Sequence, residues 1–578
     1  MKKFIKLLSA ILSVAIMATG LTACGPVGPD DNIDIDTDKV QIYVSHYNGG
    51  VGKAWLDKII TDFETQYADY DGVEGKVGVQ IVPNNHKTQG DSLAADLLNE
   101  KDEVFFTDGS AYYEMVSTGV VLDISTVLTD TNADGKTIES KLNEQQKSYY
   151  KVNGAYYALP HYEIFGGLTY NRGLFDSEQF FFAKGGAPSE YCDYIQQNNT
   201  DHAPIENKFT SYTDCEFTNL DGELSAGPDG KYGTSDDGLP ATYEEFFVLC
   251  DRMVEYSTNP FTWSGQVGKA YMGYLLGALL ADCDGQEMME LSYNFDNGIA
   301  DKLIQSIDNN GNITWEYNVP INKNTGYKIF RTEGMYRALQ FLDRMTSNSS
   351  YYSSKLTEGQ AHSHISAQRE FVLSQFNPDK WNNGKYIGML VEGAYWENEA
   401  RDMGIFDDLS ESNKTAADVS YANMPMPKVD ESRIGEKATV SEGQGNLTFV
   451  RKNIDEEKVD IIKEFVKFCY TDAKLQEFTA ITGVTRGLNY DLSNVSGVGL
   501  TDYAKSIIDL KSNSNIAYGV SGSEVYIAHQ SYFGHRFRSQ FGPYCLDEIM
   551  KSNVSARDIF NSILEHRSQT NWNSEMGI

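Results

Sequence analysis

Positively charged residues are scarce in this sequence. Its 578 residues include 48 Lys and Arg against 82 Asp and Glu, which gives a formal net charge of −34 at pH 7. So acidic a surface repels the phosphate backbones of DNA and RNA. We therefore expect no nucleic-acid partner.

Common catalytic motifs are also absent. The sequence has no P-loop, no GxGxxG, no GxSxG and no HExxH, and His362 and His364 lack the i, i+4 spacing of that last motif. We therefore expect a protein that is not an enzyme and has no catalytic residues. A glycosidase needs only two carboxylates at a set separation, so a cell-surface glycan hydrolase is kept as an alternative.

Cysteine is sparse and widely spaced. None of the seven cysteines forms a CxxC, and six of them lie beyond Cys24. An even number permits disulfides outside the cell. Cys250 and Cys469 fall inside helical patterns typical of buried thiols, which leaves Cys192–Cys215 as the one pair to test.

The only marked hydrophobic run lies at the N-terminus. Residues 7–17 are apolar and follow three lysines, and small residues lead from there to Cys24. The run is shorter than the roughly 20 residues that a spanning helix needs, so residues 1–23 are predicted to be a signal peptide. Removing it takes away three lysines and no acid, which leaves 555 residues and changes the charge from −34 to −37.

Residues 21–24, Leu-Thr-Ala-Cys, are similar to a bacterial lipobox, in which Cys24 is lipidated. Ordinary secretion with a chance cysteine is the alternative. Residues 24–39 are rich in Gly, Pro and Asp and are predicted to be a flexible tether. We expect a protein anchored by lipid at the extracytoplasmic face of the cell membrane.

Strand and helix patterns alternate after the tether. Strands are expected at 40–45, 77–82 and 104–106, with helices at 53–67 and 91–99 between them. This alternation predicts an α/β domain with a parallel sheet, whose ligands bind beyond the carboxyl ends of the strands. His46 and Tyr47 follow the first strand, and Asp108 follows the third.

Residues 153–175 contain two extended segments that meet at Pro160. Proline cannot donate to a sheet ladder and holds its predecessor in an extended geometry. We interpret this stretch as a crossing between two lobes, with Glu163 facing the cleft. Beyond it, residues 177–240 lack periodicity and are predicted to be an insertion.

Two acidic loops suggest calcium. Residues 130–135 have the spacing D-x-N-x-D-G of an EF-hand, but Lys141 stands where the closing Glu is expected, which favours a solvated turn. In the second loop Asp229, Asp236 and Asp237 lie among flexible glycines. Hard oxygen ligands of this kind suit Ca²⁺, so this loop is a candidate structural calcium site, with a solvated acidic turn as the alternative. No other cofactor is expected.

Several segments in a fixed order resemble a known family. They are NGAYYALP, LTYNRGLF, PATYEEF, GKYIGMLVEGAYWE, MPMPK and GQGNLTFV followed by DIIKEFVKFCYTDAKLQEF. Together they resemble the extracellular solute-binding proteins of ABC importers, in the carbohydrate-binding family that includes maltose-binding protein. The resemblance implies an α/β, two-lobed periplasmic-binding-protein-like fold with a hinge of crossing strands, no catalysis, the permease subunits of an importer as partners, and a monomer.

The same resemblance sets the expected domains. The first lobe would span 40–160, with about 385–445 returning to it, and the second lobe would span 161–384. Residues 446–578 would supply C-terminal helices, mainly of the second lobe. The 177–240 insertion has no counterpart in the family pattern.

A sugar offers an apolar face of C–H groups and a rim of hydroxyls, which aromatic rings and carboxylates or amides bind. The family's ligand-stacking Trp matches Trp396. The other candidate ligand contacts are Trp55, Tyr47, His46, Asp108, Glu163, Trp263 and Trp381. Packing in the core, capping or solvation is the alternative for each. The expected function is a receptor that captures a carbohydrate, namely an oligosaccharide, and an adhesion lipoprotein without transport is a further alternative.

Overall fold

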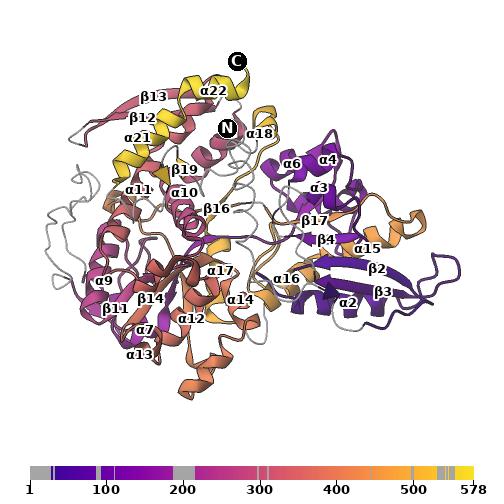
Figure 1. Cartoon of the computed structure of the whole chain (residues 1–578), viewed down its shortest axis with the longest axis horizontal. Coiled ribbons are helices and arrows are strands. Elements are labelled where there is room, and N and C mark those ends of the chain that lie inside the picture. The colour runs from indigo at the N-terminus through magenta and orange to yellow at the C-terminus, as the bar shows by residue number, and fades with distance from the viewer. Residues whose placement is uncertain are drawn as a thin grey trace, which may run out of the picture.

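We describe a computed structural model of the chain (Figure 1). It covers residues 28–29, 33–47, 49–85, 93–107, 109, 111–186, 215–295, 298–308, 311–443, 445–495, 500–529, 540–541, 544–545 and 554–578. Cys24, Asp108 and Cys192, which carry predictions made above, lie outside these ranges. Among the helices in the described ranges, none is long and apolar enough to cross a membrane.

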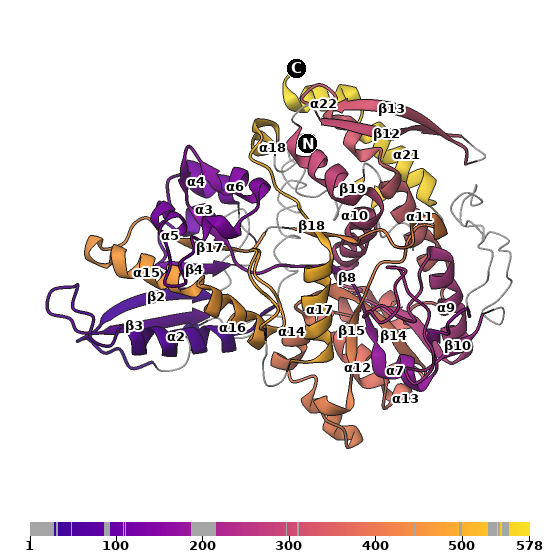
Figure 2. The same cartoon turned by 180° about the vertical axis from the view of Figure 1, so that it is seen from behind.

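The elements form two lobes with the chain crossing between them (Figures 1 and 2). The first lobe is built on a six-stranded sheet with the order β1-β3-β2-β4-β17-β7. Its strands are β1 (Gly28–Pro29), β2 (Val40–His46), β3 (Val79–Asn85), β4 (Val104–Thr107), β7 (Ala158–Pro160) and β17 (Leu447–Val450). As expected, β2 lies parallel to both β3 and β4.

Helices cover this sheet because each buries one apolar stripe. Helix α2 (Ala54–Gln66) buries Trp55, Leu56, Ile59 and Phe63. Phe63 packs edge-on against Phe465 of α15 (Val459–Cys469), with ring centroids 5.0 Å apart. The other elements of this lobe are α3 (Leu93–Asp96), α4 (Tyr112–Ser117), α5 (Ser125–Thr129), α6 (Glu144–Tyr150), the β5–β6 hairpin (Lys151–Val152 and Ala155–Tyr156) and α16 (Asp472–Thr482).

The second lobe is built on a four-stranded sheet with the order β11-β14-β8-β15. Its strands are β8 (Gly166–Asn171), β11 (Thr258–Thr262), β14 (Tyr386–Gly393) and β15 (Tyr421–Met424). The prediction that residues 385–445 return to the first lobe is therefore wrong for β14 and β15. Strand β14 pairs with β8 on one side and β11 on the other, so it is central to the second sheet.

Helices surround the second sheet. They are α7 (Arg172–Ser177), α9 (Tyr243–Glu255), α10 (Gly268–Asn294), α11 (Glu333–Ser347), α12 (His364–Ser374), α13 (Pro378–Trp381), α14 (Trp396–Asp402) and α17 (Asp502–Asn513). Thr242 caps the start of α9, because its side chain accepts a hydrogen bond from the Glu245 amide.

Smaller units extend this lobe. They are the pairs β9 (Phe181–Phe182) with β10 (Phe217–Thr218), β12 (Gly298–Ile307) with β13 (Ile313–Ile321), β16 (Thr439–Glu442) with β18 (Asn515–Tyr518) and β19 (Gln540–Phe541) with β20 (Tyr544–Cys545), and the helices α18 (Glu524–Ala528), α21 (Ala556–His566) and α22 (Gln569–Met576). Tyr336 of α11 packs on Phe560 of α21 at 5.3 Å. The C-terminal region is therefore divided, because β17, α15 and α16 belong to the first lobe and α17, α21 and α22 to the second.

The chain passes between the lobes three times: after Pro160, before Leu447 and after Thr482. The crossings are hydrogen-bonded to one another. The His161 amide donates to the Asn446 carbonyl at 2.8 Å, and the Glu163 amide donates to the Thr485 carbonyl at 2.9 Å. These three segments form the hinge, and the crossing expected at Pro160 is one of them.

Candidate functional site

Glu163 lies inside the hinge and not on a ligand-facing surface, so its predicted placement is wrong. Its side chain is 0% exposed. One carboxylate oxygen accepts hydrogen bonds from Lys511 Nζ at 2.6 Å and from the Thr485 hydroxyl, and the other accepts from the Tyr518 hydroxyl at 2.9 Å. The three donors come from three different segments, so Glu163 fastens the first crossing to the third and to α17 and β18.

Trp55 is also a packing residue. It is 2% exposed, and its indole N–H donates to the Gly52 carbonyl at 3.0 Å. Its ring lies 4.9 Å from the guanidinium of Arg486, which is also 4.2 Å from the ring of Phe478, and these two rings contact each other at 5.3 Å. The buried cation thus lies against several aromatic rings near the hinge.

Arg486 fixes the protonation of its neighbour His161. Arginine can only donate, so its 2.8 Å contact with His161 Nδ1 makes that nitrogen the acceptor and places the proton on Nε2. Burial, followed by the charges of Arg486 and His46, holds the pKa of His161 well below its usual range. His161 is therefore neutral at pH 7.

Trp396 occupies the core of the second lobe. It is 0% exposed, and its ring packs against Tyr421 at 5.3 Å, Tyr503 at 5.4 Å and Phe371 at 5.7 Å. A ligand cannot reach it in this arrangement. The neighbouring residue Tyr395, which precedes the first residue of α14, is half-buried. Consecutive residues at a helix start point in different directions, so the helix buries one aromatic and leaves the other accessible.

The remaining predicted contacts are dispersed. Trp263 is 1% exposed and packs on Tyr352 at 5.7 Å in the second lobe. Trp381 is half-buried at the end of α13, with the Lys380 ammonium 4.7 Å from its ring centre. His46 is buried at the end of β2, and Tyr47 follows it, half-buried. Of these, His46 and Tyr47 lie near the crossing segments.

A group of side chains that the sequence did not single out lies where the second lobe faces the hinge. We call it the aromatic–acidic cluster; its members are Tyr271, Tyr274, Glu392, Tyr395 and Glu399. Strand β14 ends beside Glu392, α14 carries Glu399, and α10 presents the two tyrosines. The rings of Tyr271 and Tyr274 meet edge-on at 5.6 Å, and Tyr271 lies close enough to Glu392 to influence the pKa of its carboxyl group.

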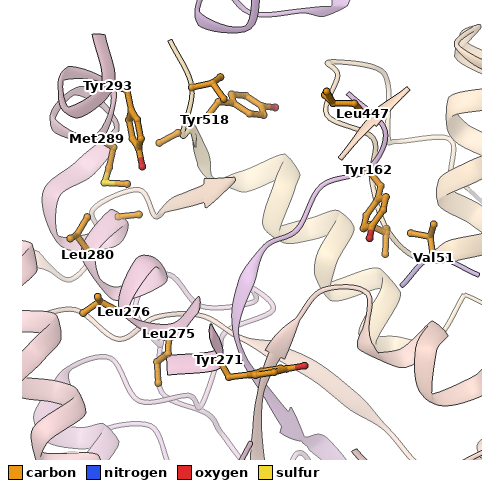
Figure 3. Close-up of a cluster of buried hydrophobic side chains, with 14 of the residues drawn as sticks. Val51, Tyr162, Tyr271, Leu275, Leu276, Leu280, Met289, Tyr293, Leu447 and Tyr518 are labelled. Atoms are coloured by element: carbon orange, nitrogen blue, oxygen red, sulfur yellow. The ribbon is translucent and has the colours of Figure 1, made fainter. Parts of the chain in front are cut away.

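The first lobe closes on this cluster. The ring of Tyr162, in the first crossing, lies 6.5 Å from that of Tyr395. Figure 3 shows Tyr162 and Tyr271 in one view, with the Tyr271 hydroxyl pointing toward the side on which Tyr162 lies. The turn after β2 completes the contact, because a Cβ on Gly50 would lie 2.8 Å from the Tyr162 hydroxyl, and one on Gly52 would lie 2.5 Å from an Asp402 carboxylate oxygen. Both glycines have a φ of +66°, which other residues rarely adopt.

The two acids of the cluster are linked by one amide. Gln368 Nε2 donates to Glu399 Oε2 at 2.8 Å and lies 3.4 Å from Glu392 Oε2. Burial, and then the neighbouring charge of Glu399, raises the pKa of Glu392 well above its usual range. Burial also raises the pKa of Asp402, with a further contribution from Glu399. The raised pKa favours the protonated form of Glu392, which can donate a hydrogen bond.

These residue types suit polyhydroxylated ligands. Tyrosine faces cover apolar C–H surface, and their hydroxyls, the carboxyls and Gln368 exchange hydrogen bonds with a hydroxyl rim. One signal in the sequence could have indicated the cluster: Tyr271 and Tyr274 are three residues apart and so share one face of a helix.

The acidic loops make internal hydrogen bonds. The Thr234 hydroxyl donates to Asp236 at 2.6 Å, and the amides of Asp229 and Gly233 donate to Asp236 and Asp237 at 3.0 and 2.6 Å. Within the described ranges, no group of three or more His, Cys, Asp or Glu side chains is arranged to hold a metal ion. Calcium at this loop stays a prediction.

In the first acidic loop a lysine supplies the positive charge. Lys141 Nζ lies 3.3 Å from Asp134 and 2.7 Å from Asp472 and is 3% exposed. The residue that breaks the EF-hand pattern thus neutralises the loop. Elsewhere, Cys250, Cys283 and Cys469 are buried free thiols, and Cys215 is buried as well.

Comparison with known proteins identifies the fold. No family model and no curated protein matches the chain. Among solved structures, a chitin oligosaccharide binding protein is similar over 94% of this chain and 100% of its own, with a TM-score of 0.52 and 13% identity. RafE from Streptococcus pneumoniae has a TM-score of 0.49 at 11% identity over 94% and 100%. An ABC transporter binding protein from Bifidobacterium animalis subsp. lactis, in complex with mannobiose, has a TM-score of 0.48 at 12% identity over 93% and 95%.

The first of these similarities confirms the expected fold class. The chain has the two-lobed α/β fold of a solute-binding protein, with a hinge of crossing segments.

Proposed function

We propose that this protein is the carbohydrate-binding receptor of an ABC importer and captures an oligosaccharide between its lobes. One observation carries the proposal: the hinge-borne Tyr162 faces Tyr395 of the second lobe at 6.5 Å, beside buried acids and an amide. Aromatic faces next to carboxyl and amide groups are what a sugar requires. The fold supports the proposal because proteins of this architecture can close around a ligand.

Capture would proceed by lobe closure. Contacts from both lobes exist together only in the closed state, so a ligand that bridges Tyr162 and Tyr395 favours that state by its differential affinity. The buried hinge contacts of Glu163 and Arg486 keep the crossings in register while the lobes move.

The N-terminal sequence suggests how the protein is anchored, and the proposed function suggests its partners. We propose lipidation at Cys24, with residues 24–39 as a tether to the extracytoplasmic face of the membrane. A single acyl chain binds a membrane marginally, whereas several chains on one cysteine hold it stably. The proposed partners are the permease subunits of the importer, which would receive ligand from a monomeric receptor.

A melting-temperature screen against an oligosaccharide panel tests the proposal, because a ligand that binds only the folded state raises its apparent stability. Hits are then titrated by calorimetry. We expect saturable binding of at least one oligosaccharide and no released sugar after prolonged incubation.

Hydrolysis of a bound oligosaccharide would replace the receptor by the glycan hydrolase. Saturable binding without stimulation of any importer in reconstituted vesicles would favour the adhesion lipoprotein. Failure of every carbohydrate to bind would overturn the proposal.

A further inference from the structure

We infer that the ligand carries a basic amine, and that its ammonium group docks on the aromatic–acidic cluster. The ligand class is then an amine-bearing oligosaccharide. This inference rests on the proposed function and makes it more specific.

The charge pattern of the cluster is the first argument. Glu392 and Glu399 are 3% and 7% exposed. Among the described residues, no Lys or Arg lies within salt-bridge distance of either, and the one basic neighbour is His364, whose Nε2 is 3.6 Å from Glu399 Oε1. Two buried carboxyl groups therefore lie together without a fixed cation.

Other buried acids of this protein provide the contrast. Glu163 pairs with Lys511 at 2.6 Å, Asp282 with Lys428 at 2.8 Å, and Glu244 with Arg344 at 3.0 Å. Each of these acids is less than a tenth exposed, like those of the cluster. A buried charge without a partner is costly. The cluster lacks the cation that these sites have, and it lies where the ligand is proposed to bind.

An unsatisfied acceptor is the second, independent argument. Gln368 is 0% exposed, and its Nε2 donates to both acids. Its Oε1, on the same amide carbon, has no hydrogen-bond partner. A buried carbonyl oxygen without a donor costs free energy. An ammonium group has three N–H donors and no acceptor, which matches one amide oxygen and two carboxylates.

The surrounding rings favour the same ligand. The rings of Tyr271, Tyr274 and Tyr395 lie beside the acids, and the faces of such rings attract cations. Asp402, also on α14, adds a carboxylate toward the turn at Gly52. The charge of Arg401 acts on Asp402, and the Arg401 guanidinium donates to Asn398 at 2.9 Å. The region where the lobes meet is therefore acidic and aromatic.

Binding would be accompanied by proton release. The raised pKa of Glu392 favours its protonated form in the free protein, and the arriving ammonium forms N–H···O bonds to the Glu392 and Glu399 carboxylates. The carboxyl proton of Glu392 leaves to solvent, and no covalent bond of the ligand changes. Glu399, Tyr271, Gln368 and His364 are the polar groups that face this exchange from α14, α10 and α12.

The test uses matched oligosaccharides that differ only at one substituent. Gluco- and galacto-configured oligosaccharides with an amine, an N-acetyl group or a hydroxyl at position 2 are titrated by calorimetry in two buffers of different ionisation enthalpy. We expect an amine form to bind about tenfold more tightly than its neutral counterparts, the scale of one charge-assisted hydrogen bond, and to release protons. If neutral forms bind and no amine form binds more tightly, the inference fails and the proposed function stands. If no oligosaccharide binds, the proposed function fails.

Variants locate the effect. Glu392→Gln and Glu399→Gln keep the shape but cannot carry a charge, so each should remove the amine preference, measured as the ratio of the amine and neutral affinities within the same variant. Glu397→Gln is the matched control, because Glu397 lies on the same helix but accepts from the Thr501 hydroxyl at 2.6 Å. Asp402→Asn, at an exposed position, serves if a buried variant does not fold. If Glu392→Gln and Glu399→Gln fold and still prefer the amine, the assignment is overturned. If they do not fold, an amine preference that survives in Asp402→Asn overturns it.

Discussion

The rings of Tyr162 and Tyr395 approach each other edge-on, with centroids 6.5 Å apart and planes at 83°, although the two residues belong to different parts of the fold. Tyr162 lies on the first crossing, and Tyr395 precedes a helix of the second lobe. Any change in the angle between the lobes must alter this distance. The pair therefore reports on both ligand binding and closure.

Tyr395→Ala should weaken oligosaccharide binding by about 1–3 kcal/mol, through loss of one stacking and desolvation contact. Calorimetric titration measures the change, and the melting temperature of the free protein should stay nearly constant because Tyr395 is only half-buried. Trp381→Ala is the control, since that half-buried indole lies at the end of α13, away from the cluster. Unchanged affinity in Tyr395→Ala would remove this residue from the site.

Trp396→Ala should act on stability and not on ligand contact. Replacing a fully buried Trp by Ala typically lowers the free energy of unfolding by about 3–5 kcal/mol. Urea denaturation checks this, with Trp396→Phe as a milder variant that retains most of the packing. A Trp396→Ala protein with normal stability and lost affinity would instead return this residue to the binding surface.

Lys511→Met should destabilise the hinge. It removes the cation bonded to Glu163 at 2.6 Å and leaves a buried acid, which costs about 3–5 kcal/mol. The double variant Glu163→Gln with Lys511→Met should recover most of that loss, because no charge is then left unpaired. Denaturation of the two single variants and the double variant gives the coupling free energy, and additive effects would contradict a direct pairing.

His161 should make the protein less stable in acid. Its folded-state pKa lies well below that of the unfolded chain, so the unfolded state binds more protons once the pH falls below about 6.5. The contribution is fully present above that pH and declines as the pH falls, by up to about 1.4 kcal/mol per pH unit. His161→Asn keeps an acceptor for Arg486 and cannot titrate. Urea denaturation between pH 7 and 5 should show a shallower decline for this variant than for the original chain.

Calcium at residues 229–238 can be tested directly. If the loop binds Ca²⁺, adding the ion should raise the melting temperature and a chelator should reverse the shift. Asp236→Asn should abolish the response, whereas Asp134→Asn, in the loop already neutralised by Lys141, should keep it. Identical melting with calcium and with chelator would show that the loop is an acidic turn.

Local patterns predicted much of the fold. The alternation of strands and helices over residues 40–106 and the break at Pro160 depend on neighbouring residues, and the structure has them where they were expected. The position of β14 could not be obtained in this way, because its pairing with β8 joins segments more than 200 residues apart.

The site was harder to predict for the same reason. The local sequence around Glu163 predicts an accessible acid. The contact that makes it a buried hinge residue comes from Lys511, 348 residues later in the chain. Trp396 and Tyr395 are adjacent, so which of the two is buried in the core depends on how α14 is rotated about its axis. Packing of Trp396 against Phe371 and Tyr503 sets that rotation. The sequence pattern therefore located the segment that contributes to the candidate site, but not the side chain within it that faces the site.

The turn at Gly50 and Gly52 sets how near the lobes can come. A single methyl group at Gly52 would meet the Asp402 carboxylate at 2.5 Å, so the exposed Asp402 side chain would have to turn away, and the φ of +66° would strain any larger residue there. The hydrogen atoms that glycine carries in place of a side chain therefore set the spacing between this turn and α14. That spacing shapes the surface that the protein presents to any partner that recognises its closed form.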